Sequence, residues 1–211
     1  MGWAQEPEKE GPEKVQIFSL GAAALLTVGA RSLNLNQPPA NCGPCDRATV
    51  PGFDRWSIHS EIDLHSDISD VLIAGLIAGS LVDLAVVEGG KAMVTTVEAA
   101  TWTLAVTELS KVLIGRKRPV LYTDAALDHV NNEESLRSMP SGHTSVAFAV
   151  ATSYLLIPRD RENRLPAYLM GAAAVSIGVL RVTSGRHFPS DIVVGAALGT
   201  LTAGLVHEVR F

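Results

Sequence analysis

Three short segments of this sequence bring together residue types that suit chemistry on a phosphate group. They are residues 111–119 (KVLIGRKRP), 140–143 (PSGH) and 181–191 (RVTSGRHFPSD). Lys111, Arg118 and Arg181 supply three cations, and the planar guanidinium of arginine suits paired contacts with oxygen atoms. Phosphoryl transfer depends mainly on neutralising such oxygens and on holding a nucleophile in line. The three segments therefore predict an anion site built for phosphate.

The second segment opens an apolar block, so Ser141, Gly142 and His143 are expected at the start of a helix. Free backbone N–H groups and the helix dipole favour an anion at that position. Gly142 has no Cβ and therefore lets an anion approach the backbone closely. These residues are predicted to bind the phosphate together with the three cations.

The third segment contains a candidate nucleophile. His187 and Asp191 are four residues apart, a spacing that puts two side chains on one face of a helix. Asp191 can then accept a hydrogen bond from one ring nitrogen of His187 and fix its tautomer. The other nitrogen is left free to attack phosphorus.

The three segments in this order resemble the signature of the type 2 phosphatidic acid phosphatase family, which includes bacterial acid phosphatases and vanadium haloperoxidases. The spacing within every segment matches, but Leu180 stands where the family usually has serine. The resemblance, to the bacterial membrane lipid phosphatases in particular, implies a phosphohistidine on His187. It also implies that His143 protonates the leaving oxygen and then activates water, with no metal and no cofactor.

Six apolar blocks separated by polar punctuation are predicted to be helices that position these segments. They cover residues 15–30, 66–87, 91–114, 141–157, 166–182 and 189–209. No strand alternation is evident, so the sequence predicts an all-α bundle with the site at one end. The bundle is expected to be one domain, residues 15–211, after an acidic tail at residues 1–14 that does not resemble a secretory signal peptide.

The composition favours a protein whose helices span a membrane. Hydrophobic residues make up 47% of the chain and charged residues 18%, and residues 71–87, 168–180 and 192–206 are apolar on nearly every face. Asp83, Glu98 and Glu108 oppose this, because carboxylates at membrane depth are costly unless they face the bundle interior. A soluble helical bundle therefore stays open. The net charge of −5 argues against nucleic-acid binding.

The two cysteines, Cys42 and Cys45, lie in one loop. They are too few for a structural zinc site, and a redox-active pair lacks its usual strand-then-helix context. A local disulfide is the preferred interpretation, and it indicates an oxidising compartment. Counting helices as crossings places this loop and the three segments on one face, with three arginines in residues 159–164 on the other. We therefore expect a bacterial inner-membrane protein whose site faces the periplasm or the outside.

Several functions remain open at this point. The leading hypothesis is a membrane phosphatase acting on a lipid phosphate or lipid pyrophosphate. Alternatives are a soluble periplasmic acid phosphatase of broad specificity, a vanadate-dependent halide oxidation enzyme, and a catalytically silent membrane scaffold or lipid-binding module. The acidic residues Asp63, Asp67 and Asp70 are expected to favour the start of a helix rather than to bind a divalent cation. The sequence predicts no particular lipid and no oligomeric state.

Overall fold

The computed structural model describes residues 12–33, 41–88, 90–157 and 164–211. The acidic tail falls mostly outside this part of the chain, and so do Gly89 and nearly all of the arginine-bearing segment 159–164. Within these ranges there are six long helices: α1 (Pro12–Ser32), α3 (Asp63–Asp83), α4 (Gly90–Ile114), α6 (Gly142–Leu156), α7 (Leu165–Thr183) and α8 (Pro189–Arg210). Each corresponds to one predicted block, and the described ranges contain no strand, so the predicted all-α fold is confirmed.

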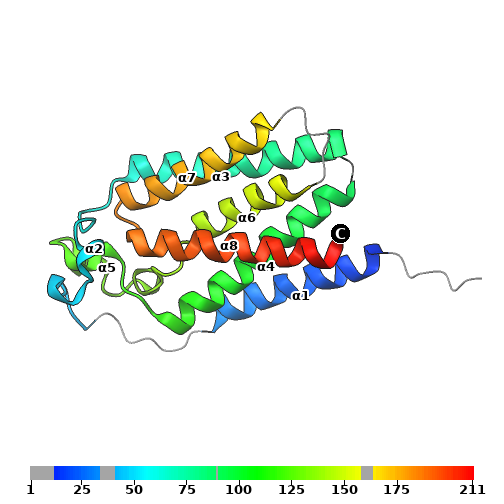
Figure 1. The fold of residues 1–211 in the computed structure, drawn as a ribbon. Coiled ribbons are helices and arrows are strands. Elements are labelled where there is room, and N and C mark those ends of the chain that lie inside the picture. Colours follow the sequence, from blue (N-terminus) through cyan, green and yellow to red (C-terminus); the bar gives the residue numbers. More distant parts are fainter. Residues whose placement is uncertain (1–11, 34–40, 89, 158–163) are drawn as a thin grey trace, which may run out of the picture.

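The shorter elements lie between these helices. They are α2 (Gly52–Arg55), α5 (Ala126–His129), three 3₁₀ turns (Arg47–Thr49, Pro119–Tyr122 and Glu133–Leu136) and a π-helical extension of α3 (Leu84–Glu88). Figure 1 shows α2 and α5 beside the end of α7 and the start of α8, with the C-terminus at the opposite end of the bundle. The short elements therefore cover one end of the bundle.

Helix α6 is the central helix, since it packs against α3, α4, α7 and α8. Small residues bring α6 and α8 into close contact, because a Cβ added at Gly199 would lie only 2.0 Å from the carbonyl oxygen of Ser145. Ala147 and Ala149 of α6 are completely buried. Close packing through Gly and Ala is typical of helices in lipid.

In the part of the chain that the structure describes, four helices are long and apolar enough to cross a membrane: Lys14–Ser32, Asp63–Val87, Leu165–Thr183 and Pro189–Arg210. Large apolar side chains such as Leu25, Val71 and Leu205 are exposed on their outer faces. Such faces are costly in water but suit a lipid environment.

The carboxylates that opposed a membrane fold have polar partners within the bundle, and two of the three, Glu98 and Glu108, are buried, whereas Asp83 is half-buried. Glu98 of α4 is buried and accepts hydrogen bonds from Arg210, and Asp83 accepts one from the hydroxyl of Tyr154 at 2.7 Å. The third, Glu108, is buried beside Lys111. Because buried carboxylates with partners avoid most of the cost of lipid exposure, they do not count against membrane insertion.

Candidate active site

The three segments meet at a pocket of about 290 Å³ at the covered end of the bundle. Six of the eight predicted catalytic and phosphate-binding residues line it: Lys111, Arg118, Gly142, His143, Arg181 and His187. The other two, Ser141 and Asp191, are fully buried and support the lining residues from behind. Side chains that sequence analysis did not select also line the pocket: Arg31, Ile73, Leu104, Glu108, Glu134 and Val146.

The three predicted cations are all buried, with exposed fractions of 8% for Lys111, 9% for Arg118 and 5% for Arg181. The Nε atoms of both arginines are buried and have no hydrogen-bond partner within the described structure. Buried polar groups are normally paired, so these two donors are available to an anion in the pocket. Burial lowers the pKa of the Arg118 guanidinium, and the carboxylate of Glu134, 3.1 Å away, opposes that effect.

Each cation has a partner that fixes its position. Lys111 Nζ donates to Glu108 Oε1 at 2.9 Å. Arg181 Nη1 donates to two hydroxyls of α3, Ser66 Oγ at 3.1 Å and Ser69 Oγ at 3.2 Å. These contacts hold the cationic groups in place before any substrate is bound, which lowers the cost of ordering them.

The start of α6 forms one wall of the pocket. Ser141 is the N-cap residue of the helix, and its backbone N–H donates to the carbonyl of Asp191 at 3.1 Å. A Cβ added at Gly142 would lie 3.2 Å from Lys111 Nζ, closer than ordinary van der Waals contact. The glycine therefore lets the lysine ammonium approach the helix start, whereas close approach of a bound anion to Gly142 stays a prediction.

His187 is 2% exposed, and its surroundings correct one detail of the sequence analysis. The residue precedes α8, which begins at Pro189, so His187 and Asp191 do not share a helix face. Its Nδ1 lies 2.7 Å from the carbonyl oxygen of Ser138 and 3.6 Å from Asp191 Oδ2. Because a carbonyl only accepts, Nδ1 carries the hydrogen and Nε2 keeps a free lone pair.

Asp191 acts on His187 mainly through its neighbours. Its Oδ2 accepts hydrogen bonds from Ser138 Oγ at 2.6 Å and from the backbone N–H of Phe188 at 2.8 Å. Asp191 thus fixes Phe188, which follows His187, and Ser138, whose carbonyl oxygen accepts a hydrogen bond from the His187 ring. Burial lowers the pKa of His187 to about 3, so the ring is neutral at ordinary pH.

Asp70 is a site residue that the sequence analysis missed. Its Oδ1 lies 2.7 Å from His143 Nε2 and 3.6 Å from Arg181 Nη1. We expected it to act at the start of a helix, but α3 begins at Asp63 and Asp70 lies about two turns further on. The distance of Asp70 from Asp63 along the sequence was the signal that could have placed Asp70 beyond the first turn of the helix. The described residues contain no group of three or more His, Cys, Asp or Glu side chains placed to hold a metal ion.

A second buried cluster supports Asp191 from the other side. Arg116 donates to Asp191 Oδ1 and to Asp54 Oδ2, the latter at 2.7 Å. Asp54 is completely buried and also accepts from the backbone N–H of Ser190 at 3.0 Å. The Arg116 guanidinium lies over the ring of Phe188, 4.4 Å from its centroid. No sequence pattern pointed to Asp54, which lies 62 residues before Arg116.

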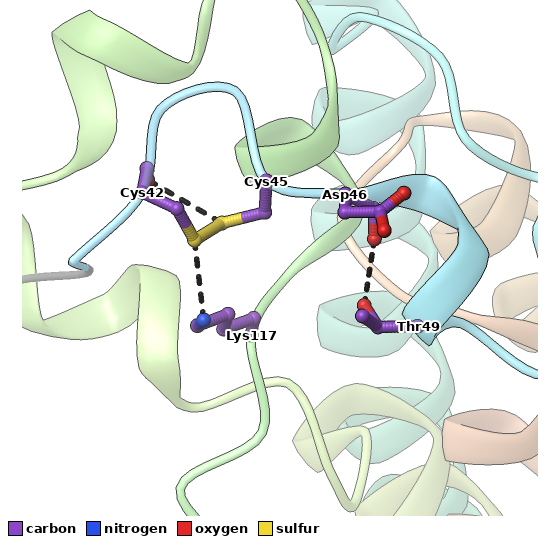
Figure 2. Close-up of a disulfide and its surroundings, with 5 residues drawn as sticks. All are labelled: Cys42, Cys45, Asp46, Thr49 and Lys117. Atoms are coloured by element: carbon purple, nitrogen blue, oxygen red, sulfur yellow. Dashed lines mark hydrogen bonds between the residues drawn. A yellow bond between two sulfur atoms is a disulfide. The ribbon is translucent and has the colours of Figure 1, made fainter.

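Cys42 and Cys45 form a disulfide in the structure (Figure 2). Lys117 Nζ lies 3.2 Å from Cys42 Sγ, and the backbone N–H of Cys45 donates to the carbonyl of Leu121 at 2.8 Å. The disulfide loop therefore packs on the chain that flanks Arg118, at the same end of the bundle as the pocket.

The protein is thus a bundle of apolar helices with buried cations and a neutral buried histidine at one end. The sequence model of the PAP2 superfamily matches residues 92–211. Because this match covers more than half of the chain, the protein belongs to the PAP2 superfamily, and the resemblance found in its motifs is confirmed. With its four apolar helices, it is a membrane protein.

Curated relatives share part of this region. The chain is 37% identical over 95 residues to a lipid A 1-phosphatase of Rhizobium etli, covering 43% of this chain and 38% of that protein. It is 36% identical over 106 residues to a decaprenylphosphoryl-5-phosphoribose phosphatase of Mycobacterium tuberculosis, covering 50% and 54%. It is 36% identical over 107 residues to phosphatidylglycerophosphatase B of Bacillus subtilis, covering 46% and 49%. The matches thus span about half or less of these relatives, and no solved structure is significantly similar to the chain.

Proposed function

We propose that this protein is a metal-independent phosphatase that hydrolyses a lipid phosphate or lipid diphosphate through a phosphohistidine. One observation carries the proposal: the neutral, buried His187 lines a pocket in which Arg118 and Arg181 have unpaired N–H donors. A neutral imidazole is the nucleophilic form, and unpaired donors are what the equatorial phosphoryl oxygens require.

The first step forms the covalent intermediate. The phosphoryl oxygens bind Lys111, Arg118 and Arg181, and Nε2 of His187 attacks phosphorus as the bond to the leaving oxygen breaks. The leaving oxygen takes a proton from His143. The carbonyl of Ser138 holds the Nδ1 hydrogen, so positive charge that develops on the ring is stabilised at that atom.

The second step releases phosphate. His143 has lost its proton and accepts one from a water molecule, whose oxygen attacks phosphorus as the bond to Nε2 breaks. Inorganic phosphate leaves and His187 is again neutral. Asp70, 2.7 Å from His143 Nε2, positions this ring and stabilises its protonated form in each cycle.

Three observations support a lipid substrate and a setting in the bacterial inner membrane. Apolar side chains from three helices, Ile73, Leu104 and Val146, line the pocket beside its charged groups. The relatives named above carry the names of lipid phosphatases. The disulfide lies at the same end as the pocket, which supports a site on the oxidising, periplasmic side.

The experiment measures phosphate release from lipid phosphates in detergent micelles, with EDTA present, for wild type and His187→Ala. We expect EDTA-resistant turnover by wild type and loss of at least a thousandfold in the variant. His207→Ala is the matched control, because His207 is also buried but lies near the opposite end of α8. Dependence on added metal, or equal activity of wild type and His187→Ala, would refute the proposal.

A further inference from the structure

The pocket contains a buried carboxylate whose contacts extend beyond the lysine that it positions. Glu108 is 4% exposed and lies three residues before Lys111 on α4. Its Oε1 accepts from Lys111 Nζ at 2.9 Å, and its Oε2 lies 3.4 Å from Nε of Arg31. A carboxylate beside a phosphate-binding lysine weakens the attraction for an anion, so its presence in the pocket calls for another role.

The charges that line the pocket match one class of phosphate. Four cationic side chains and two carboxylates line it: Arg31, Lys111, Arg118, Arg181, Glu108 and Glu134. The Asp70 carboxylate adds one negative charge beside them, and the protonated His143 that it contacts adds one positive charge. With His187 neutral the surplus is therefore two positive charges, which balances the dianion of a phosphate monoester. A diphosphate brings further negative charge, and the Glu108 carboxylate would face it.

The position of this pair indicates which part of a substrate it meets. His187 is 2% exposed and marks the inner end of the pocket, whereas the side chain of Arg31, at the end of α1, is 59% exposed and marks its rim. In an in-line transfer the leaving group lies opposite the nucleophile. The leaving group of a substrate attacked by His187 therefore points toward Arg31 and Glu108.

We propose that Arg31 and Glu108 form a leaving-group subsite that selects lipid phosphate monoesters with a hydroxyl-bearing leaving group and disfavours lipid diphosphates. The inference rests on the proposed phosphatase function. A guanidinium only donates and a carboxylate only accepts, so together they bind both the oxygen and the hydrogen of a hydroxyl group. A second phosphate would gain from Arg31 but be repelled by Glu108, which Lys111 already holds in place.

The test compares kcat/KM for three substrates in one detergent. Phosphatidylglycerol phosphate has a leaving group with a free hydroxyl, and a three-carbon glycerol separates its phosphodiester from the leaving oxygen. Phosphatidate has a leaving group with neither, and a polyprenyl diphosphate carries the second phosphate directly on the leaving oxygen. Wild type should prefer them in that order. Glu108→Gln should raise the ratio of diphosphate to phosphatidate turnover about tenfold, since it removes one negative charge beside the second phosphate. Arg31→Ala should lower the ratio of phosphatidylglycerol phosphate to phosphatidate about fivefold.

Ratios separate a specificity role from a structural one, because a displaced Lys111 would lower all three values by the same factor. Glu98→Gln is the matched control: Glu98 is also buried on α4, but it pairs with Arg210 outside this pocket, so both ratios should equal those of wild type. Unchanged ratios in Glu108→Gln, or a wild type that prefers the diphosphate, would overturn the subsite while leaving the phosphatase intact. A wild type that hydrolyses none of the three would overturn the proposed function as well.

Discussion

The link between Arg116 and two buried carboxylates gives a prediction whose size follows from the structure. Arg116→Met keeps the length of the apolar stem but removes the partner of Asp54 and Asp191, both 0% exposed. Removing one partner of a buried ion pair costs about 3–5 kcal/mol. Both carboxylates keep other hydrogen-bond donors, so we expect the lower end, about 3 kcal/mol. For a chain of this size that corresponds to a fall in Tm of about 6–12 °C.

The assay is thermal unfolding of the detergent-solubilised protein, together with kcat on a lipid phosphate. Lys117→Met is the matched control, because this neighbouring residue contacts Cys42 Sγ and neither carboxylate. The control should shift Tm by no more than about 2 °C, as expected for a substitution away from buried pairs. In Arg116→Met kcat should also fall below that of the control, because Asp191 holds Ser138, whose carbonyl accepts from His187. Equal Tm values for the two variants would refute the assignment of Arg116 as the partner of these buried charges.

Four further predictions concern His187, the disulfide and Asp70. Because burial lowers the pKa of His187 to about 3, the rate of single-turnover phosphohistidine formation should not fall as the pH is lowered through 6.5, the ordinary pKa of histidine. A fall in rate on that acidic side would contradict the assignment of His187 as the nucleophile. The same shift should reduce stability as the pH falls below about 6.5, since the unfolded chain then takes up a proton that the folded chain does not, as thermal unfolding at several pH values would show. Replacing Cys42 and Cys45 by serine should cost about 2 kcal/mol of stability, the value expected for so short a loop, and a stability equal to wild type would contradict it. Asp70→Asn should lower kcat about tenfold or more with little change in KM, because it removes the negative charge of the side chain that contacts His143. A change in KM alone would argue against this role.

The sequence predicted the long helices well because their boundaries depend on local chemistry. Prolines open α7 and α8 at their first turns, and Gly115 ends α4 with a positive φ of 59°, which glycine adopts without strain. The motif residues were predicted to meet because the helices are antiparallel crossings that return each segment to one end. The sequence did not predict hydrogen bonds between residues far apart in the chain, such as the one between Ser138 and Asp191, which are 53 residues apart. No periodicity records such a contact.

His187 and Asp191 lie close together, but the shared helix face inferred from their spacing is wrong. Their spacing of four suggested one helix face, yet Pro189 lies between them and is the residue that starts α8. Proline favours the first helical turn, so His187 falls before the helix and Asp191 falls within its first turn. From there the Asp191 carboxylate accepts the backbone N–H of Phe188 and stabilises the chain around the histidine. The same four-residue spacing thus serves a capping arrangement in addition to the 3.6 Å contact between the carboxylate and the histidine ring.

Leu180 can be understood in the same way. The family usually places serine at this position, before the phosphate-binding arginine, and leucine removes that hydroxyl from the site. In this chain Arg181 donates to two other hydroxyls, those of Ser66 and Ser69, which α3 supplies. Ser69 is itself fixed by donating to the carbonyl of Ser66 at 2.7 Å. Holding a buried guanidinium requires an acceptor at the right distance and not a particular residue before it, so the hydroxyls of α3 can fix Arg181 without a serine at position 180.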